Sequence, residues 1–194
     1  MSGEVPGGAG EVPGGAGEVP GGAGEVPGGA GKVPGGAGEV PGGAGEVPDE
    51  RGGEGLERFV LAQDAGGTYR QALAELRNGR KVSHWMWFVF PQIAGLGRSA
   101  TSRRYAIASL ADARAYLEHP LLGARLRECA GVLARLPNAD AEAILGEIDA
   151  QKLRSSMTLF MRARPSEGVF AEVLERYFGG RPDGATDKLL GPLM

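Results

Sequence analysis

The N-terminal part of the chain is a repeated heptapeptide that cannot form a packed core. The unit Gly-Glu-Val-Pro-Gly-Gly-Ala recurs from Gly3 to Ala44, with Lys32 in place of glutamate in one copy. Its only apolar residues are valine and alanine, so a fold would bury too little surface to offset the loss of backbone entropy. We therefore expect residues 1–55 to be a disordered, low-complexity tail and residues 56–194 to be the folded domain.

Residues 56–194 have the length of one globular domain and a charge opposite to that of the tail. The chain carries 21 Lys and Arg residues and a net charge of -3, and all of these basic residues except Lys32 and Arg51 lie in the domain. A mildly basic domain suits an anionic ligand. It lacks the clustered basic and aromatic residues of a nucleic-acid-binding module, so we do not expect nucleic acid as a partner.

Several classes of protein are excluded by what the sequence lacks. One cysteine excludes a disulfide framework and a cysteine-based zinc site within the chain, and no His, Asp or Glu grouping has the spacing of metal ligands. There is neither an apolar stretch of membrane-spanning length nor a signal-peptide pattern. We expect a cytoplasmic protein with no metal, no cofactor and no membrane partner.

Apolar residues at helical spacing, separated by glycine, proline and capping residues, predict an all-α domain. Ser109 followed by Asp112 resembles a capping box, Asp149 is placed to cap a helix over residues 150–163, and Gly179 stops the helix before it. Six or seven short helices joined by short loops predict a compact single-domain bundle.

The segment Ser83–Phe90, SHWMWFVF, has no polar face, and most of it should lie in the core. An unbroken apolar run does not distinguish a buried strand from a buried helix. A helix beginning near Ser83 is favoured, because the chain has no second strand-like run to pair with it. His84 is a candidate general acid or base at a pocket's edge, and a hydrogen-bonded core histidine is the alternative.

The stretch from Gly95 to Arg104 combines bendable backbone, hydroxyl groups and three arginines. These are the ingredients of an anion or phosphate cradle, with Arg98, Ser99 and Ser102 as candidate binding residues. A solvated surface loop is the alternative. The stretch is not a P-loop, and its loose Gly-x-Gly-x-x-Ala match lacks the βαβ units of a dinucleotide site.

Lys152 and Ser156 lie four residues apart on one expected helical face, so that the lysine could reach the serine hydroxyl. A Ser/Lys nucleophile pair is usually written Ser-x-x-Lys, and here the order is reversed. Hydrogen bonding of the serine to the neighbouring backbone is the more common role.

Four segments in this order, LERFVLAQ, ALAELRNGRKVSHWMWFVFPQIAGLGRSATSRRYAI, YLEHPLLGARLREC and KLRSSMTLF, resemble the bacterial domain of unknown function 1810 family. The resemblance covers Leu56 to about Leu190 and implies a compact, mainly α-helical domain without an established activity. Some members are labelled calpastatin, a label these residues do not support. The family's motif residues fall on His84, Trp85, Trp87, Pro91, Gln92, Gly97, Arg98, Ser99, Ser102, Tyr105, Lys152, Ser155 and Ser156.

Together these features predict that the domain binds a small anionic, nucleotide-like metabolite. Aromatic faces would stack a ring, and Arg, Ser and Lys side chains would hold phosphate. Whether the protein is an enzyme stays open, and hydrolysis or group transfer with His84 as acid or base is the chemistry to test. The alternative is a non-enzymatic interaction module whose basic loop meets an acidic protein partner. The expected binding residues are Trp87, Gln92, Arg98, Ser99, Ser102, Lys152 and Ser156.

Overall fold

A computed structural model describes residues 51–191, with side chains from Gly55 onward. The all-α fold predicted from the sequence is confirmed for this part of the chain. The helices are α1 (Arg51–Asp64), a short 3-10 turn η1 (Ala65–Gly67), α2 (Thr68–Arg77), α3 (Met86–Val89), α4 (Ala100–Arg104), α5 (Leu110–Glu118), α6 (Leu122–Arg135), α7 (Ala141–Leu145), α8 (Glu147–Ala163), α9 (Gly168–Phe178) and α10 (Gly184–Leu190).

The predicted disordered tail falls almost wholly outside the described residues. Its last residues, 51–55, belong to α1, so that this helix begins before the expected domain boundary at Leu56. The division into a tail over residues 1–55 and a domain over residues 56–194 stays a prediction. Between residues 51 and 191, no helix is long and apolar enough to cross a membrane.

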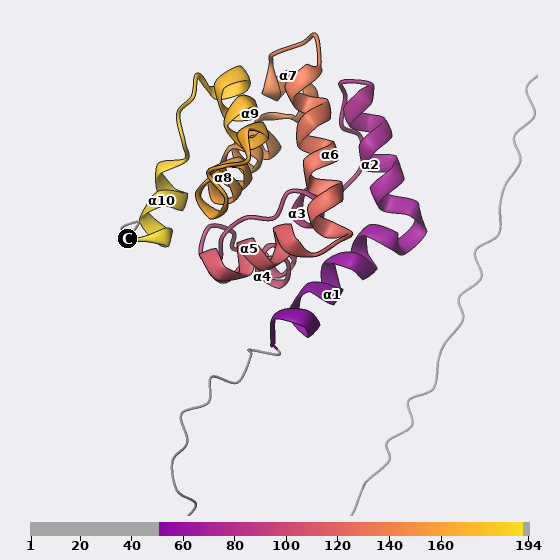
Figure 1. Cartoon of the computed structure of the whole chain (residues 1–194). Coiled ribbons are helices and arrows are strands. Elements are labelled where there is room, and N and C mark those ends of the chain that lie inside the picture. The colour runs from indigo at the N-terminus through magenta and orange to yellow at the C-terminus, as the bar shows by residue number, and fades with distance from the viewer. Residues whose placement is uncertain (1–50, 192–194) are drawn as a thin grey trace, which may run out of the picture. The chain divides into compact units, whose positions relative to one another are not determined.

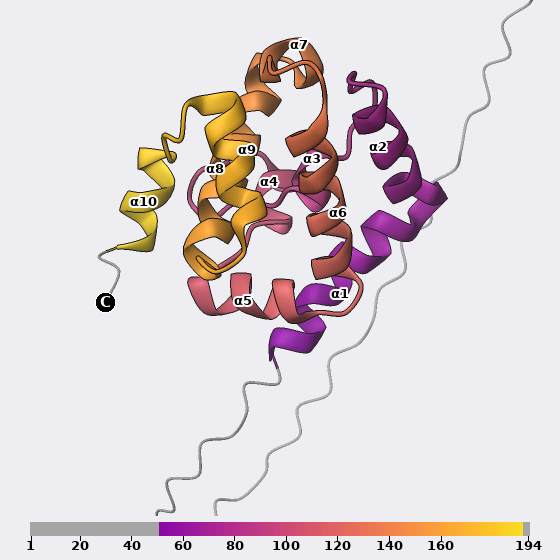
Figure 2. The ribbon, with the colours of Figure 1, turned by 45° about the horizontal axis from the view of Figure 1, so that its top comes forward.

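Helix α8 is the centre of the packing, because it contacts α5, α7, α9 and α10. Its inner face is apolar, and Leu153, Met157 and Phe160 are fully buried there. Helix α6 lies between α2 and α9, as Figure 1 shows. In Figures 1 and 2, α1 and α2 run along one side of the domain and α10 lies at the opposite edge. The core is therefore shared by all the longer helices.

The apolar segment Ser83–Phe90 contains a helix and no strand, which confirms the favoured prediction. The helix is only the single turn of α3, and it starts at Met86 instead of near Ser83. Trp85 and Phe90 flank it and are fully buried, whereas His84 is exposed. Most of the segment is thus core, and His84 is not a core histidine.

A buried carboxylate, that of Glu75 on α2, holds the segment before α3. It accepts hydrogen bonds from the backbone N–H groups of Val82 (2.8 Å) and Ser83 (3.1 Å), from the Ser83 hydroxyl (2.7 Å) and from the indole Nε1 of Trp85 (2.8 Å). Burial opposes its ionisation, but these hydrogen bonds outweigh burial and lower the pKa of Glu75 from 4.5 to about 2. The N–H groups of Val82 and Ser83 therefore have a charged acceptor in Glu75, which ties this segment to α2.

Two of the predicted helix ends are confirmed and one is wrong. The Ser109 hydroxyl accepts the N–H of Asp112, as the capping box requires, and Gly179 ends α9 in the left-handed conformation. Asp149 does not cap α8, because the helix already begins at Glu147 after Gly146, whose φ is 82°. Asp149 lies in the first turn, where its carboxylate is available to lysines.

Replacing Glu75 by glutamine removes the charge that holds the Val82–Trp85 segment. We expect Glu75→Gln to lower the free energy of unfolding by about 2 kcal/mol at pH 7, since hydrogen bonds to a buried charge are lost. The folded-state pKa lies below the ordinary value of 4.5, so the wild-type advantage is present above pH 4.5 and disappears as the pH falls towards 2. Urea unfolding at pH 7 and pH 3 measures both effects.

The control for this variant is Glu172→Gln, at an exposed position of α9. It changes the net charge equally and should alter stability little at either pH. An advantage of wild type over Glu75→Gln that stayed constant between pH 7 and pH 3 would contradict the role given to the ionised Glu75.

Candidate functional site

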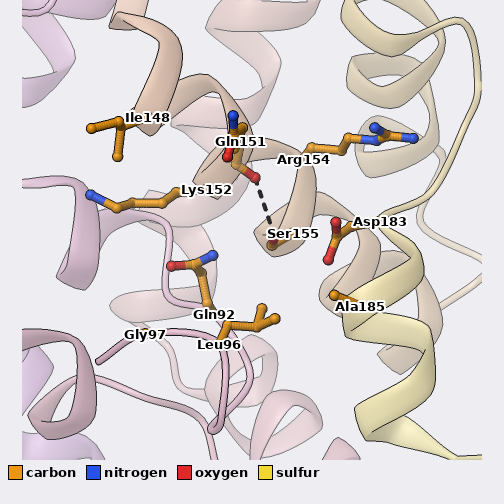
Figure 3. Close-up of a pocket in the computed structure, with 10 residues that line it drawn as sticks. All are labelled: Gln92, Leu96, Gly97, Ile148, Gln151, Lys152, Arg154, Ser155, Asp183 and Ala185. Atoms are coloured by element: carbon orange, nitrogen blue, oxygen red, sulfur yellow. Dashed lines mark hydrogen bonds between the residues drawn. The ribbon is translucent and has the colours of Figure 1, made fainter. Parts of the chain in front are cut away.

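Among the described residues, a pocket of about 500 Å³ lies between the loop that follows α3, one face of α8 and the beginning of α10 (Figure 3). Its volume lies in the range of small-molecule sites. The residues that line it are Gln92, Leu96, Gly97, Ile148, Gln151, Lys152, Arg154, Ser155, Asp183 and Ala185.

The loop that carries Gln92 is fixed to the rest of the domain by a short parallel bridge. The carbonyl of Gln92 accepts the N–H of Ile107 (2.9 Å), and the N–H of Ala94 donates to the carbonyl of Ile107 (2.8 Å). Further along, a Cβ on Gly97 would lie 2.3 Å from the Cβ of Ser102, so only glycine fits there. The lower wall of the pocket is therefore built on backbone contacts and held in place.

Two lysines share one carboxylate at one edge of the pocket, and of these three residues only Lys152 lines it. Asp149 Oδ2 lies 2.7 Å from Lys81 Nζ, and Asp149 Oδ1 lies 2.7 Å from Lys152 Nζ. The three side chains are only 10%, 15% and 20% exposed for Lys81, Asp149 and Lys152. Burial raises the pKa of Asp149, but the two lysines more than compensate and leave it lowered. The cluster holds two ammonium groups against one carboxylate, which leaves one positive charge unbalanced.

Both ammonium groups also lie over tryptophan rings. Lys81 Nζ is 5.4 Å from the ring centre of Trp85, and Lys152 Nζ is 4.6 Å from that of Trp87. These distances are those of cation–π contacts, which stabilise a cation on the ring face. One face of Trp87 is therefore covered by Lys152, and Trp87 is not among the residues that line the pocket.

The opposite side of the pocket is formed by Asp183, the residue before α10. Its N–H donates to Thr158 Oγ1 (2.8 Å), and its Oδ2 accepts the N–H (2.8 Å) and the hydroxyl (2.7 Å) of Thr186. Arg154 donates to the two carbonyls of Arg181 and Pro182, 2.9 Å and 3.0 Å away. The loop that presents Asp183 is thus fixed from both sides.

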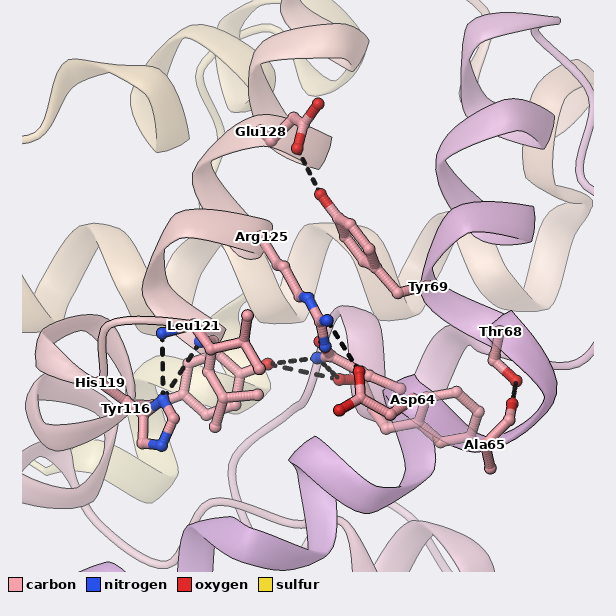
Figure 4. A network of polar contacts seen from close by, with 12 residues as sticks. Asp64, Ala65, Thr68, Tyr69, Tyr116, His119, Leu121, Arg125 and Glu128 are labelled. Carbon is pink, nitrogen blue, oxygen red and sulfur yellow. Dashed lines mark hydrogen bonds and ion pairs between the residues drawn. The ribbon is translucent and has the colours of Figure 1, made fainter.

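A second polar cluster joins α1, α5 and α6 (Figure 4). Gln63 is buried, donates to the carbonyl of Phe88 (2.7 Å) and the hydroxyl of Tyr116 (3.1 Å), and accepts from Arg125 (3.2 Å). Arg125 also pairs with Asp64 (2.7 Å). The polar groups of this cluster are hydrogen-bonded to one another. We therefore infer that the cluster stabilises the fold and does not bind a ligand.

The predicted site residues are only partly brought together. Gln92 and Lys152 both line the pocket, although they are far apart in sequence. Ser99 caps the short helix α4 by accepting the N–H of Ser102 (3.0 Å), and the Ser102 hydroxyl donates to the carbonyl of Ser99 (2.8 Å). Arg98 follows the pocket-lining Gly97 and is exposed. Arg98, Ser99 and Ser102 therefore lie beside the pocket without lining it.

His84 and Ser156 lie outside the pocket for opposite reasons. His84 is exposed in the loop before α3, and it is absent from the set of lining residues. Ser156 is fully buried, and its hydroxyl has no hydrogen-bond partner among the described residues. Lys152 turns to Asp149 and Trp87, so no contact activates Ser156 as a nucleophile.

Sequence reasoning missed Asp183 and Arg154 as members of the pocket. The Pro182-Asp183-Gly184 sequence has the composition of a turn that opens a helix, which was the available signal for Asp183. No local pattern marks Arg154, because its partners are backbone carbonyls of a distant loop. Between residues 55 and 191, no three His, Cys, Asp or Glu side chains are grouped so that they could hold a metal ion.

Comparison with known proteins places the chain in a family. A family model described as "Protein of unknown function (DUF1810)" matches residues 53–190. The chain belongs to this family. A search of curated proteins found no match. The conserved hypothetical protein Rv1873 from Mycobacterium tuberculosis, which has a crystal structure, is 50% identical in sequence to this chain. The two structures have a TM-score of 0.67, and the match covers 70% of this chain and 95% of that one.

The family membership confirms the resemblance seen in the sequence, and the family description names no function. What this member of the DUF1810 family binds must therefore be argued from its own pocket.

The buried hydroxyl of Ser156 gives a prediction about stability. Because the hydroxyl is buried without a partner, we expect Ser156→Ala to leave the free energy of unfolding unchanged or to raise it by up to about 1 kcal/mol. Thr158 lies two residues further along α8 and is also fully buried. Thr158→Val should instead lower the free energy of unfolding by about 1–2 kcal/mol, since the Thr158 hydroxyl donates to the carbonyl of Arg154 and accepts the N–H of Asp183. Urea unfolding of both variants measures this contrast, and a loss of stability in Ser156→Ala would show that the hydroxyl has a partner.

Proposed function

We propose that the domain binds a small anionic metabolite in the pocket between the Gln92–Gly97 loop, α8 and the start of α10. The observation that carries the proposal is the sharing of Asp149 by Lys81 and Lys152 at the pocket's edge. Two ammonium groups held against one carboxylate, in a region that is only slightly exposed, form a positively charged site in which an anion is poorly screened by solvent.

An anion would reach this charge by competing with Asp149 for Lys152. Lysine is a flexible point charge with three donors, so its ammonium group can turn from Asp149 to a ligand. Lys81 stays paired with Asp149 when Lys152 turns away, and the carboxylate is not left alone in a buried position. The shared pairing therefore lowers the cost of recruiting Lys152.

Phosphate is the anionic group that this arrangement suits best. Gln92 and Gln151 line the same pocket and supply amide donors beside Lys152, whereas the Ser155 hydroxyl donates to the carbonyl of Gln151. Arg98, one residue beyond the pocket-lining Gly97, carries a further positive charge. Ring stacking on Trp87 has less support, because Lys152 covers one face of that ring. The proposal therefore concerns the phosphorylated part of the metabolite.

The proposal is one of binding and not of a reaction. His84, the candidate acid or base, is exposed and is not a lining residue, so its catalytic role stays a prediction. The expected cytoplasmic location would suit a phosphorylated metabolite and also stays a prediction.

A second candidate, an interaction module for an acidic protein, is favoured by one observation. Arg98, Arg103 and Arg104 are all exposed at α4 and its preceding loop, where they present guanidinium groups to the outside. Such a surface would attract a negatively charged partner through long-range electrostatics. The two candidates differ in which basic residues bind the anion.

Removing Lys152 tests the proposed pocket directly. We expect Lys152→Ala to weaken the binding of inorganic phosphate to the full-length chain by roughly tenfold or more, because a charge-assisted contact is lost. Isothermal titration calorimetry measures the affinity. Lys188→Ala, at an exposed position of α10, removes the same charge outside the pocket and should leave the affinity unchanged.

Arg98→Ala in the same titration separates the two candidates. A weaker phosphate affinity would assign the loop to the pocket, and an unchanged affinity would leave the loop to another partner. An equal loss in Lys152→Ala and Lys188→Ala would count against the pocket as the binding site.

Removing the competing carboxylate should have the opposite effect to removing the lysine. Asp149→Asn keeps the shape of the side chain and releases both lysines, so we expect phosphate to bind roughly fivefold more tightly, with a steeper dependence on salt concentration. Titrations at two ionic strengths measure both changes. Weaker phosphate binding in Asp149→Asn would show that Asp149 does not compete for Lys152.

A further inference from the structure

We infer that the metabolite is a phosphorylated polyhydroxy compound of the sugar phosphate type, with its phosphate at Lys152 and its hydroxyl groups at Asp183. This inference rests on the proposed function, since it assigns the rest of the ligand once the anion is placed at Lys152. The observation behind it is the opposite chemistry of the two sides of one pocket.

Lys152 and Asp183 come from opposite sides of the pocket, as Figure 3 shows. The ammonium group of Lys152 lies on the side of α3 and Asp149, and the carboxylate of Asp183 lies on the side of α10. A ligand that was anionic throughout would meet repulsion at Asp183. Arg154 lines the same side, but its guanidinium donates to the carbonyls of Arg181 and Pro182. A ligand that fits both sides is anionic at one end and donates hydrogen bonds at the other.

One carboxylate oxygen of Asp183 is available to accept a hydrogen bond from a ligand hydroxyl. Its Oδ2 accepts both the N–H and the hydroxyl of Thr186, while Oδ1 has no hydrogen-bond partner among the described residues. The bonds from Thr186 and the bond between the Asp183 N–H and Thr158 hold the carboxylate in place before any ligand arrives. A fixed, unshared carboxylate oxygen is a strong acceptor for a ligand hydroxyl.

The side chains between these two ends are polar and not aromatic. Figure 3 places the amide of Gln92 and the hydroxyl of Ser155 between Lys152 and Asp183, with Gln151 beside them. Amide groups both donate and accept hydrogen bonds, which matches the hydroxyl groups of a sugar. The residues that line this pocket include no aromatic ring, so nothing in it would stack a nucleobase. The chemistry favours the sugar phosphate over the base of a nucleotide.

The variant Asp183→Asn isolates the proposed contact, because asparagine caps a helix about as well as aspartate. The amide oxygen takes over the bonds to Thr186, and the NH₂ group then occupies the position of Oδ1. The acceptor in the pocket becomes a donor, and one negative charge is removed. The fold should be retained, which circular dichroism and a thermal melt can verify.

The experiment titrates the full-length wild type, Asp183→Asn and Lys152→Ala with inorganic phosphate, propyl phosphate and ribose 5-phosphate. For wild type, we expect ribose 5-phosphate to bind roughly tenfold more tightly than propyl phosphate, which lacks hydroxyl groups. In Asp183→Asn, ribose 5-phosphate should lose roughly tenfold in affinity, while inorganic phosphate should gain a few-fold because a like charge has gone. A loss of affinity for ribose 5-phosphate together with a gain of affinity for inorganic phosphate is the result that supports the inference.

The outcomes separate this inference from the proposed function. If inorganic phosphate binds wild type and is lost in Lys152→Ala, but ribose 5-phosphate binds no better than propyl phosphate, the pocket takes anions and the sugar inference is overturned. The same holds if Asp183→Asn weakens all three ligands equally, since Asp183 would then have only a structural role. If none of the three binds wild type, both proposals fall.

A second variant covers the case in which Asp183→Asn does not fold. Asp183→Ser also provides a capping oxygen for Thr186 but is too short to present a second acceptor to the pocket. It should show the same selective loss of ribose 5-phosphate. Equal affinity of this variant and wild type for ribose 5-phosphate would overturn the assignment of Asp183.

Discussion

The ionised carboxylate of Glu75 determines where the segment between α2 and α3 lies. It binds two backbone N–H groups, one hydroxyl and the indole of Trp85, all from residues 82–85. These bonds seat Trp85 in the core and place Lys81, the residue just before them, against Asp149 of α8. The backbone N–H of Lys81 also donates to the carbonyl of Ile144 (2.8 Å), so the lysine that pairs with Asp149 is held between two anchors, one of them the buried Glu75 carboxylate.

Helix α8 combines structural and candidate functional roles on different faces. Leu153, Met157 and Phe160 are buried in the core, whereas Lys152 and Ser155 line the pocket. A helix packed by several neighbours is a rigid support, and side chains on such an element are held more accurately than those on a free loop. The other walls are loops, but each is tied down by backbone hydrogen bonds, at Ile107 for one and at Thr158 and Arg154 for the other.

The parts of the fold that could be predicted are those decided within a single turn of chain. The capping box at Ser109 and the stop at Gly179 depend only on residues three or four positions apart, and both were predicted correctly. The cap assigned to Asp149 was wrong, because Gly146 allowed an earlier start and distant Lys81 gave the carboxylate another partner. The contact of Glu75 with residues 82–85 could not be predicted from local sequence either, because the carboxylate and its partners lie in different elements.

The candidate site was predictable to a similar extent. The sequence marked Gln92 and Lys152 as binding residues, and both line the pocket. It also grouped His84 and Ser156 with them, although one is exposed and the other is fully buried.

The sequence by itself determined an all-α domain, its family and the residue types available for binding an anion. The tertiary structure decided which of those residues meet: that Lys81 and Lys152 share Asp149, that Lys152 covers a face of Trp87, and that Asp183 faces the same pocket. The physical reason is the range of the interactions. Helical periodicity and capping act over a few residues and are written in the local order of the chain, whereas the pocket forms only when the faces of distant elements pack together.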